Sequence, residues 1–154
     1  MSDQDIDITQ LLAFTQQQGA SDLHLIAKRE PMLRLSGDLR PIKTGALSQD
    51  TVKAMLNSIM TEEQRAEYEE HMECDFAIAF GQDARFRVNA FTTNTGAAAV
   101  FRTIPTKIPS LEQLNAPATF KKFAETDRGL VLVTGPTGSG KSTTLAAMIN
   151  HINQ

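Results

Sequence analysis

The feature that most constrains this chain is the loop at residues 135–142, Gly-Pro-Thr-Gly-Ser-Gly-Lys-Ser, which matches G-x-x-x-x-G-K-[ST] in full. A continuous apolar run, residues 130–133, precedes the loop, and residues 143–152 carry apolar side chains at helical spacing. The run is typical of a parallel strand that is buried on both faces. A strand, a glycine-rich loop and a helix in this order predict a phosphate-binding unit of the α/β class.

Each position of the loop has an expected role. Its glycines let successive N–H groups point at a phosphate. The Lys141 ammonium is expected to neutralise charge on the β- and γ-phosphates of ATP, and the Ser142 hydroxyl to ligate Mg²⁺. Thr143 is expected to add backbone or hydroxyl contacts to phosphate. The predicted nucleotide-binding residues are Gly135, Pro136, Thr137, Gly138, Ser139, Gly140, Lys141, Ser142 and Thr143.

Residues 1–104 contain no such loop and alternate between helical and strand patterns. Helices are predicted at 7–18, 48–60 and 61–70, and strands at 23–25, 32–35, 39–42, 74–80, 84–92 and 97–104. This order predicts an α+β domain with a mostly antiparallel sheet. Residues 105–117 hold three prolines and are expected to form a linker with a short helix capped by Ser110 and Gln113. A short helix at 118–125 then opens the second domain, residues 118–154.

Two arginines, Arg87 and Arg102, form a second candidate cluster. If Asn94 and Thr95 are the central residues of a hairpin, Arg87 lies directly opposite Arg102 on one sheet face. Like charges in that position destabilise a sheet unless something compensates them. Two interpretations stay open: neighbouring carboxylates pair with the arginines, or an anion such as a nucleotide phosphate binds between them.

Three other features have structural explanations. Asp22 and His24 alternate with leucines, and we expect an Asp/His pair that fixes strand and helix ends rather than a metal site. The single cysteine, Cys74, is expected to pack inside the fold. An acidic run is expected to be a solvated helix face; its members are Glu62, Glu63, Glu67, Glu69 and Glu70.

Composition excludes several other classes. The chain has 15 basic and 18 acidic residues, a net charge of −3, so no nucleic acid is expected as a partner. One cysteine excludes an internal disulfide framework. No apolar run approaches the ~20 residues that span a bilayer, and the acidic N-terminus is unlike a signal peptide. The expected location is therefore inside the cell.

Several segments together identify a family. They are Gly-Ala-Ser-Asp-Leu-His-Leu at 19–25, Arg-Phe-Arg-Val-Asn-Ala-Phe at 85–91, Val-Phe-Arg-Thr-Ile-Pro at 100–105, and residues 128–148 around the glycine-rich loop. In this order they closely resemble the PilT-like pilus retraction ATPases of twitching motility, within the bacterial secretion-ATPase superfamily. The resemblance runs from about residue 6 to the last residue.

The resemblance implies a PAS-like N-terminal domain and a RecA-like ATPase domain that begins with the P-loop. It implies a homo-hexameric motor that is cytoplasmic and peripheral to the inner membrane at the pilus base. Its partners would be an inner-membrane platform protein and a related retraction ATPase. ATP would sit in the cleft between the domains, where Arg87 and Arg102 match arginines that reach the nucleotide, and with Lys141 they are the predicted catalytic residues. Many relatives have an arginine where this chain has Thr95, so no contact is assigned to that position.

Acidic and histidine-containing motifs of the family follow the P-loop at a distance that lies beyond residue 154. We therefore expect the chain to be the N-terminal part of a longer motor, and the 154 residues alone to hydrolyse little ATP. Two alternatives stay open: a non-catalytic interaction or oligomerisation module, and a relative from pilus assembly or type II secretion.

Overall fold

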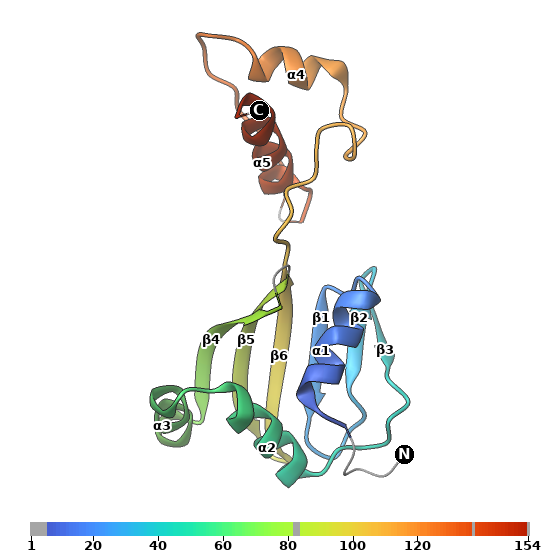
Figure 1. Cartoon of the computed structure of the whole chain (residues 1–154), viewed down its shortest axis with the longest axis vertical. Coiled ribbons are helices and arrows are strands. Elements are labelled where there is room, and N and C mark those ends of the chain that lie inside the picture. Colours follow the sequence, from blue (N-terminus) through green and yellow to red (C-terminus); the bar gives the residue numbers. More distant parts are fainter. Residues whose placement is uncertain (1–5, 82–83, 137, 154) are drawn as a thin grey trace. The chain divides into compact units, whose positions relative to one another are not determined.

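The computed structural model of the chain describes residues 6–81, 84–136 and 138–153. The chain divides into two compact units, Met1–Pro105 and Thr106–Gln154. Figure 1 labels the helices and strands of both. In the described ranges, no helix combines the length and the hydropathy that crossing a membrane requires.

The first unit is a six-stranded antiparallel sheet with three helices. The strand order is β3-β2-β1-β6-β5-β4, and every neighbouring pair is antiparallel. This confirms the mostly antiparallel sheet that the sequence predicts. The elements are α1 (Ile8–Gln17), β1 (Asp22–Ile26), β2 (Met32–Leu35), β3 (Asp38–Pro41), α2 (Gln49–Ile59), α3 (Glu62–His71), β4 (Glu73–Phe80), β5 (Ala84–Thr93) and β6 (Gly96–Ile104).

Polar residues precede all three helices, and at α2 and α3 the cap side chain accepts from an N–H group of the first turn. Asp7 precedes α1, and its N–H lies 3.5 Å from Gln10 Oε1. At α2, Ser48 Oγ accepts from the Thr51 N–H at 3.1 Å. At α3, Thr61 Oγ1 accepts from the Gln64 N–H at 3.3 Å, and Gln64 Oε1 accepts from the Thr61 N–H at 3.0 Å. Such reciprocal bonds fix where a helix starts, which is why the capping patterns predict these starts well.

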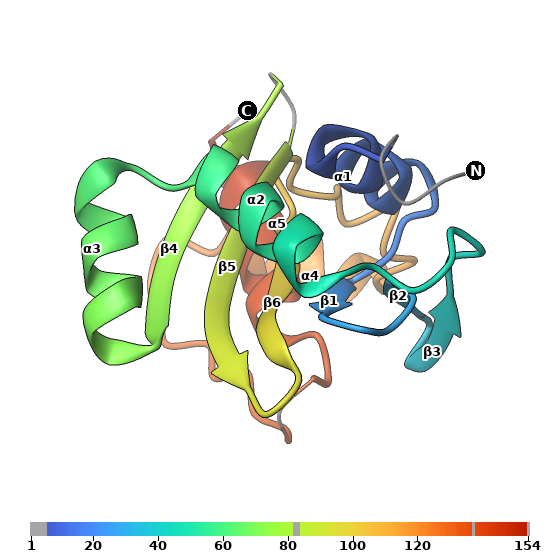
Figure 2. The same ribbon diagram turned by 90° about the horizontal axis from the view of Figure 1, so that it is seen from below.

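One face of the sheet packs against the helices. α1 contacts β1, α2 contacts β6 and α3 contacts β4. Figure 2 shows α2 across the middle of the sheet and α3 along its β4 edge. Alternate strand residues point into this core, and the largest fully buried side chains include Phe86, Phe101, Leu12, Leu23 and Leu25. Cys74 is also buried there, as expected, while the five glutamates of the acidic run are exposed.

The opposite face of the sheet carries the polar residues that alternate with this core. Because Leu23 and Leu25 point inward, Asp22 and His24 point to the other face. The β5–β6 hairpin turns at residues 94–95, so Thr93 pairs with Gly96 and Arg87 pairs directly with Arg102. This register confirms the prediction that places the two arginines opposite each other.

The second unit contains α4 (Ala118–Ala124) and α5 (Lys141–Ile152) around a small core. Leu111 packs there with Ala147 and Met148 of α5. The predicted short helix after Ser110 is wrong. Ser110 and Gln113 form the expected reciprocal hydrogen bonds, at 2.9 and 3.2 Å, but the segment is only a turn. It stops because Asn115 adopts a φ of 51° and Pro117 follows soon after.

The predicted buried strand at residues 130–133 is also wrong. These residues form no regular element, and Leu130 and Leu132 are 82% and 75% exposed. A strand exists through hydrogen bonds to a neighbouring strand, and the described part of this unit supplies none. α5 begins at Lys141, two residues before the predicted start. Its apolar stripe is only partly covered, since Met148 is buried while Ile149 and Ile152 are exposed.

Candidate functional site

The glycine-rich loop has a backbone that other residues would adopt only under strain. Gly135, Gly138 and Gly140 have φ angles of 153°, 81° and 88°. A Cβ on Gly135 would also lie 2.9 Å from the Ser139 hydroxyl oxygen. Side chains other than hydrogen are disfavoured at such φ values, so the spacing of these glycines determines the path of the loop. Thr137, one of the predicted residues, lies outside the described residues.

The loop leads directly into the N-terminus of α5. Gly140 is the N-cap residue, and its carbonyl accepts from the Thr144 N–H at 2.9 Å. Ser142 and Thr143 are exposed in the first turn. The first N–H groups of a helix have no partner inside it and carry the positive end of the helix dipole. The predicted residues from Gly138 to Thr143 therefore form a loop-to-helix junction suited to an anion.

Lys141 folds back over the loop. Its Nζ donates to the carbonyl oxygens of Gly135 and Pro136 at 2.5 and 2.6 Å. The Ser139 hydroxyl donates to the same Pro136 carbonyl at 2.7 Å, which holds the loop closed. These contacts bring a positive charge to the loop whose N–H groups suit a phosphate.

The exposed Ser142 hydroxyl is the oxygen that suits Mg²⁺ at this junction, because Mg²⁺ prefers hard oxygen ligands. Among the described residues, no group of three or more His, Cys, Asp or Glu side chains is arranged to hold a metal ion. At this junction the chain offers a metal ion one hydroxyl oxygen, that of Ser142.

The two arginines lie in the first unit, and each has a carboxylate partner. Arg87 Nη2 donates to Asp75 Oδ2 at 3.4 Å, and Arg102 Nε donates to Asp22 Oδ1 at 3.2 Å. Neighbouring carboxylates therefore compensate the like charges, as one of the two interpretations proposed. The arginine side chains are nevertheless 65% and 69% exposed, so both remain accessible to an anion.

A pocket of about 350 Å³ lies on this face of the sheet. Its lining comprises Asp75, Arg87, Asn89, Val100 and Arg102. Asp75 and Asp22 pair with the two guanidinium groups, but Asp22 is shared with Arg34, so three arginines against two carboxylates leave one positive charge in excess. Guanidinium groups present planar arrays of N–H donors that match phosphate oxygens. The pocket therefore has the charge and the donors that an anion requires.

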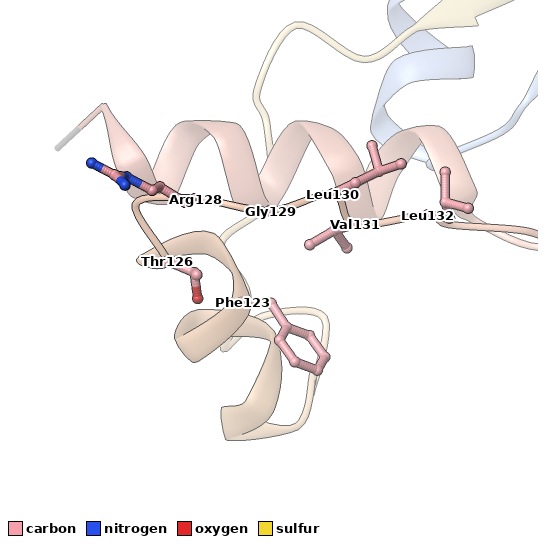
Figure 3. A pocket seen from close by; sticks show the side chains of 7 residues that line it. All are labelled: Phe123, Thr126, Arg128, Gly129, Leu130, Val131 and Leu132. Atoms are coloured by element: carbon pink, nitrogen blue, oxygen red, sulfur yellow. The ribbon is translucent and has the colours of Figure 1, made fainter.

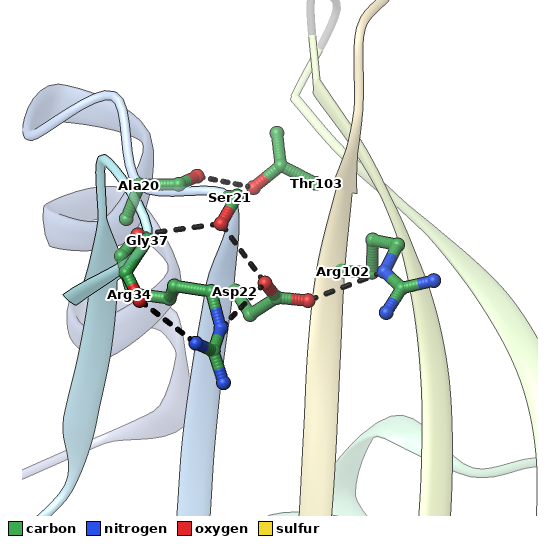
Figure 4. Close-up of polar contacts among 7 residues, drawn as sticks. All are labelled: Ala20, Ser21, Asp22, Arg34, Gly37, Arg102 and Thr103. Carbon is green, nitrogen blue, oxygen red and sulfur yellow. Dashed lines mark hydrogen bonds and ion pairs between the residues drawn. The ribbon is translucent and has the colours of Figure 1, made fainter. Parts of the chain in front are cut away.

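Sequence reasoning missed the partners of Asp22. Its carboxylate contacts Arg34 and Arg102 rather than His24 (Figure 4). His24 Nε2 is buried without a hydrogen-bond partner in the described part of the chain. Burial lowers the pKa of His24, and the charge of Arg34 lowers it further against the opposing effect of Asp22. The alternation of polar and apolar residues along β1 predicts that Asp22 lies on the outer face. Its ion pair with Arg102 could not be predicted in this way, because Arg102 lies on β6, 80 residues away in the sequence.

A second pocket, of about 490 Å³, lies within the second unit beside the exposed apolar run (Figure 3). Phe123, Leu130, Val131 and Leu132 give it an apolar wall, and Arg128 lies at its margin. It includes none of the predicted site residues.

Comparison with known proteins identifies the family. The family model described as "Type II/IV secretion system protein" matches residues 4–154. The type IV pilus retraction ATPase PilT of Pseudomonas aeruginosa is 54% identical over 96% of this chain and 43% of its own length. A twitching motility protein of Neisseria gonorrhoeae is 52% identical over 96% of this chain and 39% of its own length.

A crystal structure of the pilus retraction motor PilT with bound ADP superposes with a TM-score of 0.81 at 37% identity. The match covers 97% of this chain and 44% of that one. The chain thus spans about two fifths of the length of these relatives. Because the family model matches nearly every residue, the chain belongs to the type II/IV secretion system protein family.

Proposed function

We propose that the loop at residues 135–142 binds the phosphates of ATP. The observation that carries this proposal is the loop-to-helix junction, in which glycines with positive φ curl the backbone ahead of the N-terminus of α5. Gly138, Ser139 and Gly140 turn N–H groups toward the phosphates, Gly135 and Pro136 set the path of the loop, and Thr143 adds contacts from the first turn. Lys141 Nζ leaves its two carbonyl partners for the more strongly charged phosphate oxygens.

In this proposal, Ser142 orients the metal ion that accompanies ATP. Bound Mg²⁺ would supply charge neutralisation at the phosphates of ATP. The Ser142 hydroxyl holds its place because it lies in the first turn of α5, directly after the lysine. The first turn of α5 thus positions both Lys141 and Ser142.

Arg87 and Arg102, which lie in the first unit, are proposed to act on the phosphoryl group that is transferred. Phosphoryl transfer spreads negative charge over the transferred group, and guanidinium donors stabilise that charge. The surplus positive charge of the pocket and the exposure of both arginines support this role. We assign the two arginines and Lys141 as the residues that act on the reacting phosphates.

For the whole protein, we propose a hexameric motor ATPase that powers the retraction of type IV pili. The support is the 54% identity to PilT over nearly the entire chain. Residues 1–104 then form a PAS-like domain, 105–117 a linker, and 118–154 the start of a RecA-like ATPase domain. The motor would act at the cytoplasmic face of the inner membrane, against a platform protein of the pilus machine and beside a related retraction ATPase.

The experiment is complementation of a piliated strain that lacks its retraction ATPase. The full-length protein with this sequence is expected to restore twitching, and Lys141→Ala to abolish it. Lys122→Ala is the matched control, because Lys122 is an exposed lysine on α4 of the same unit. Equal twitching with both lysine variants would exclude the proposed role of the loop. A protein that hydrolyses ATP but never restores twitching would instead favour an assembly or secretion motor.

A further inference from the structure

The carboxylate of Asp22 lies on β1 between arginines of the two neighbouring strands. Its side chain is only 9% exposed. Oδ1 accepts from Arg102 Nε on β6, and Oδ2 accepts from the Ser21 hydroxyl at 2.9 Å and lies 3.4 Å from Arg34 Nε on β2. Figure 4 shows the carboxylate held from both sides. With both oxygens engaged, the carboxylate has little freedom to rotate.

Asp22 holds Arg102 by a particular atom. The contact uses Nε, and Figure 4 shows the two terminal nitrogens of Arg102 turned away from Asp22. A guanidinium carries five N–H donors in a planar array, four of them on the terminal nitrogens. In the part of the chain that the structure describes, those four have no assigned acceptor. The guanidinium is therefore anchored at one edge and open at the other.

The anchoring leaves the positive charge of this face in place. Arg34 and Arg102 share a single carboxylate, so the three groups together carry a net positive charge. Arg87 lies directly opposite Arg102 and is balanced by Asp75, so the excess of one positive charge remains. Asp22 therefore orients Arg102 without cancelling the attraction of the face for an anion.

We propose that Asp22 is a positioning residue, which holds Arg102 by Nε and so aims its terminal nitrogens at the phosphates of ATP. This inference rests on the function proposed above for Arg102. A supporting hydrogen bond that fixes the orientation of a catalytic group is a common form of preorganisation. Asp22 itself touches no reacting atom in this account.

The first test follows the Nε–Hε group of Arg102 by NMR in the 154-residue chain, without nucleotide. Its hydrogen is expected to exchange with water more slowly than that of Arg40, an exposed arginine on β3. Asp22→Asn is expected to remove this protection. Arg34→Gln, which removes the other partner of the same carboxylate, is expected to retain it. Protection that is absent in the unmodified chain, or that survives Asp22→Asn, overturns the proposal.

The second test measures steady-state ATP hydrolysis by the full-length protein. Asp22→Asn is expected to lower kcat by about tenfold to a hundredfold, the effect of misplacing a catalytic group by about an ångström. The KM for ATP should change little. Asp22→Glu keeps the charge that the arginines need and shifts the carboxylate by one methylene, so kcat should fall while the melting temperature is retained. Arg40→Gln, at the exposed arginine on β3 outside this cluster, should leave kcat near the unmodified value.

A double-mutant cycle separates positioning from a general structural role. In an Arg102→Ala background, Asp22→Asn is expected to cause no further loss of kcat, because Asp22 acts through Arg102. Losses that add overturn the proposal. If Arg102→Ala alone leaves kcat unchanged, the function proposed for Arg102 fails and the positioning role fails with it. If Arg102→Ala lowers kcat while both Asp22 variants keep it, only the positioning role fails.

Discussion

Lys141 and Arg102 illustrate how single residues of this chain combine a charge with a fixed geometry. Lys141 Nζ is hydrogen-bonded to two neutral carbonyls, so an incoming phosphate offers it a stronger, charge-assisted partner. Arg102 is held at Nε by a buried carboxylate and exposes the rest of its guanidinium. In both cases the side chain is already positioned, and the phosphates of the proposed nucleotide supply the charged acceptor.

Removing either arginine is expected to affect turnover more than folding. In the full-length protein, Arg87→Ala and Arg102→Ala should each lower kcat by about a hundredfold or more, as loss of a guanidinium that stabilises phosphoryl transfer does. The melting temperature should change little, since both side chains are mostly exposed. A large drop in melting temperature, with kcat per folded enzyme unchanged, would show that the arginines stabilise the sheet and do not act in catalysis.

His24 is expected to make the stability of the first unit depend on pH. Its pKa is lowered in the folded state, first by burial and then by Arg34. The unfolded chain therefore binds a proton more readily, and the free energy of unfolding should fall as the pH drops below about 6.5. His24→Phe should reduce this slope between pH 7 and pH 5 in urea unfolding curves.

His71 provides the matched control for this measurement, because it is an exposed histidine at the end of α3 in the same unit. His71→Gln should leave the pH slope intact. The explanation fails if His24→Phe and the unmodified chain lose stability in parallel as the pH falls.

At the scale of elements, short sequence patterns correctly predicted the features that neighbouring residues determine, namely helix starts and a hairpin register. The caps at Ser48 and Thr61 set helix starts, and the turn at residues 94–95 set the β5–β6 register that brings Arg87 opposite Arg102. Whether residues 130–133 form a strand could not be predicted from their own sequence, because a strand needs a partner from elsewhere in the chain. The pairing of Asp22 with Arg102 likewise depends on two strands that are distant in sequence.

The capping box of α3 gives a direct test of this local control. Thr61→Ala removes the hydroxyl that accepts from the Gln64 N–H and should lower the free energy of unfolding by about 1 kcal/mol. Glu69→Ala, an exposed change in the same helix, should have little effect. Chemical denaturation of the two variants checks the difference, and equal stability would mean that the cap does not hold the helix start.

At the scale of the whole molecule, the two units differ in how completely they bury their apolar residues. The first has a continuous core that draws on all three helices and on strands of both halves of its sheet. Among its described residues, the second buries only Leu111, Ala147 and Met148, and it leaves the 130–133 run and one face of α5 exposed. Exposed apolar surface of this kind is typical of a face that packs against another segment or subunit. The larger motor proposed here offers such partners.

The central claim is that the loop of the second unit binds the phosphates of ATP and takes part in its hydrolysis in a motor ATPase. The measurement that tests it most directly is ATP hydrolysis by the full-length protein, compared among the unmodified enzyme, Lys141→Ala and Lys122→Ala. The unmodified enzyme and the control are expected to turn over alike, while Lys141→Ala loses about a hundredfold or more in kcat at an unchanged melting temperature. Hydrolysis by Lys141→Ala at the rate of the control would contradict the claim.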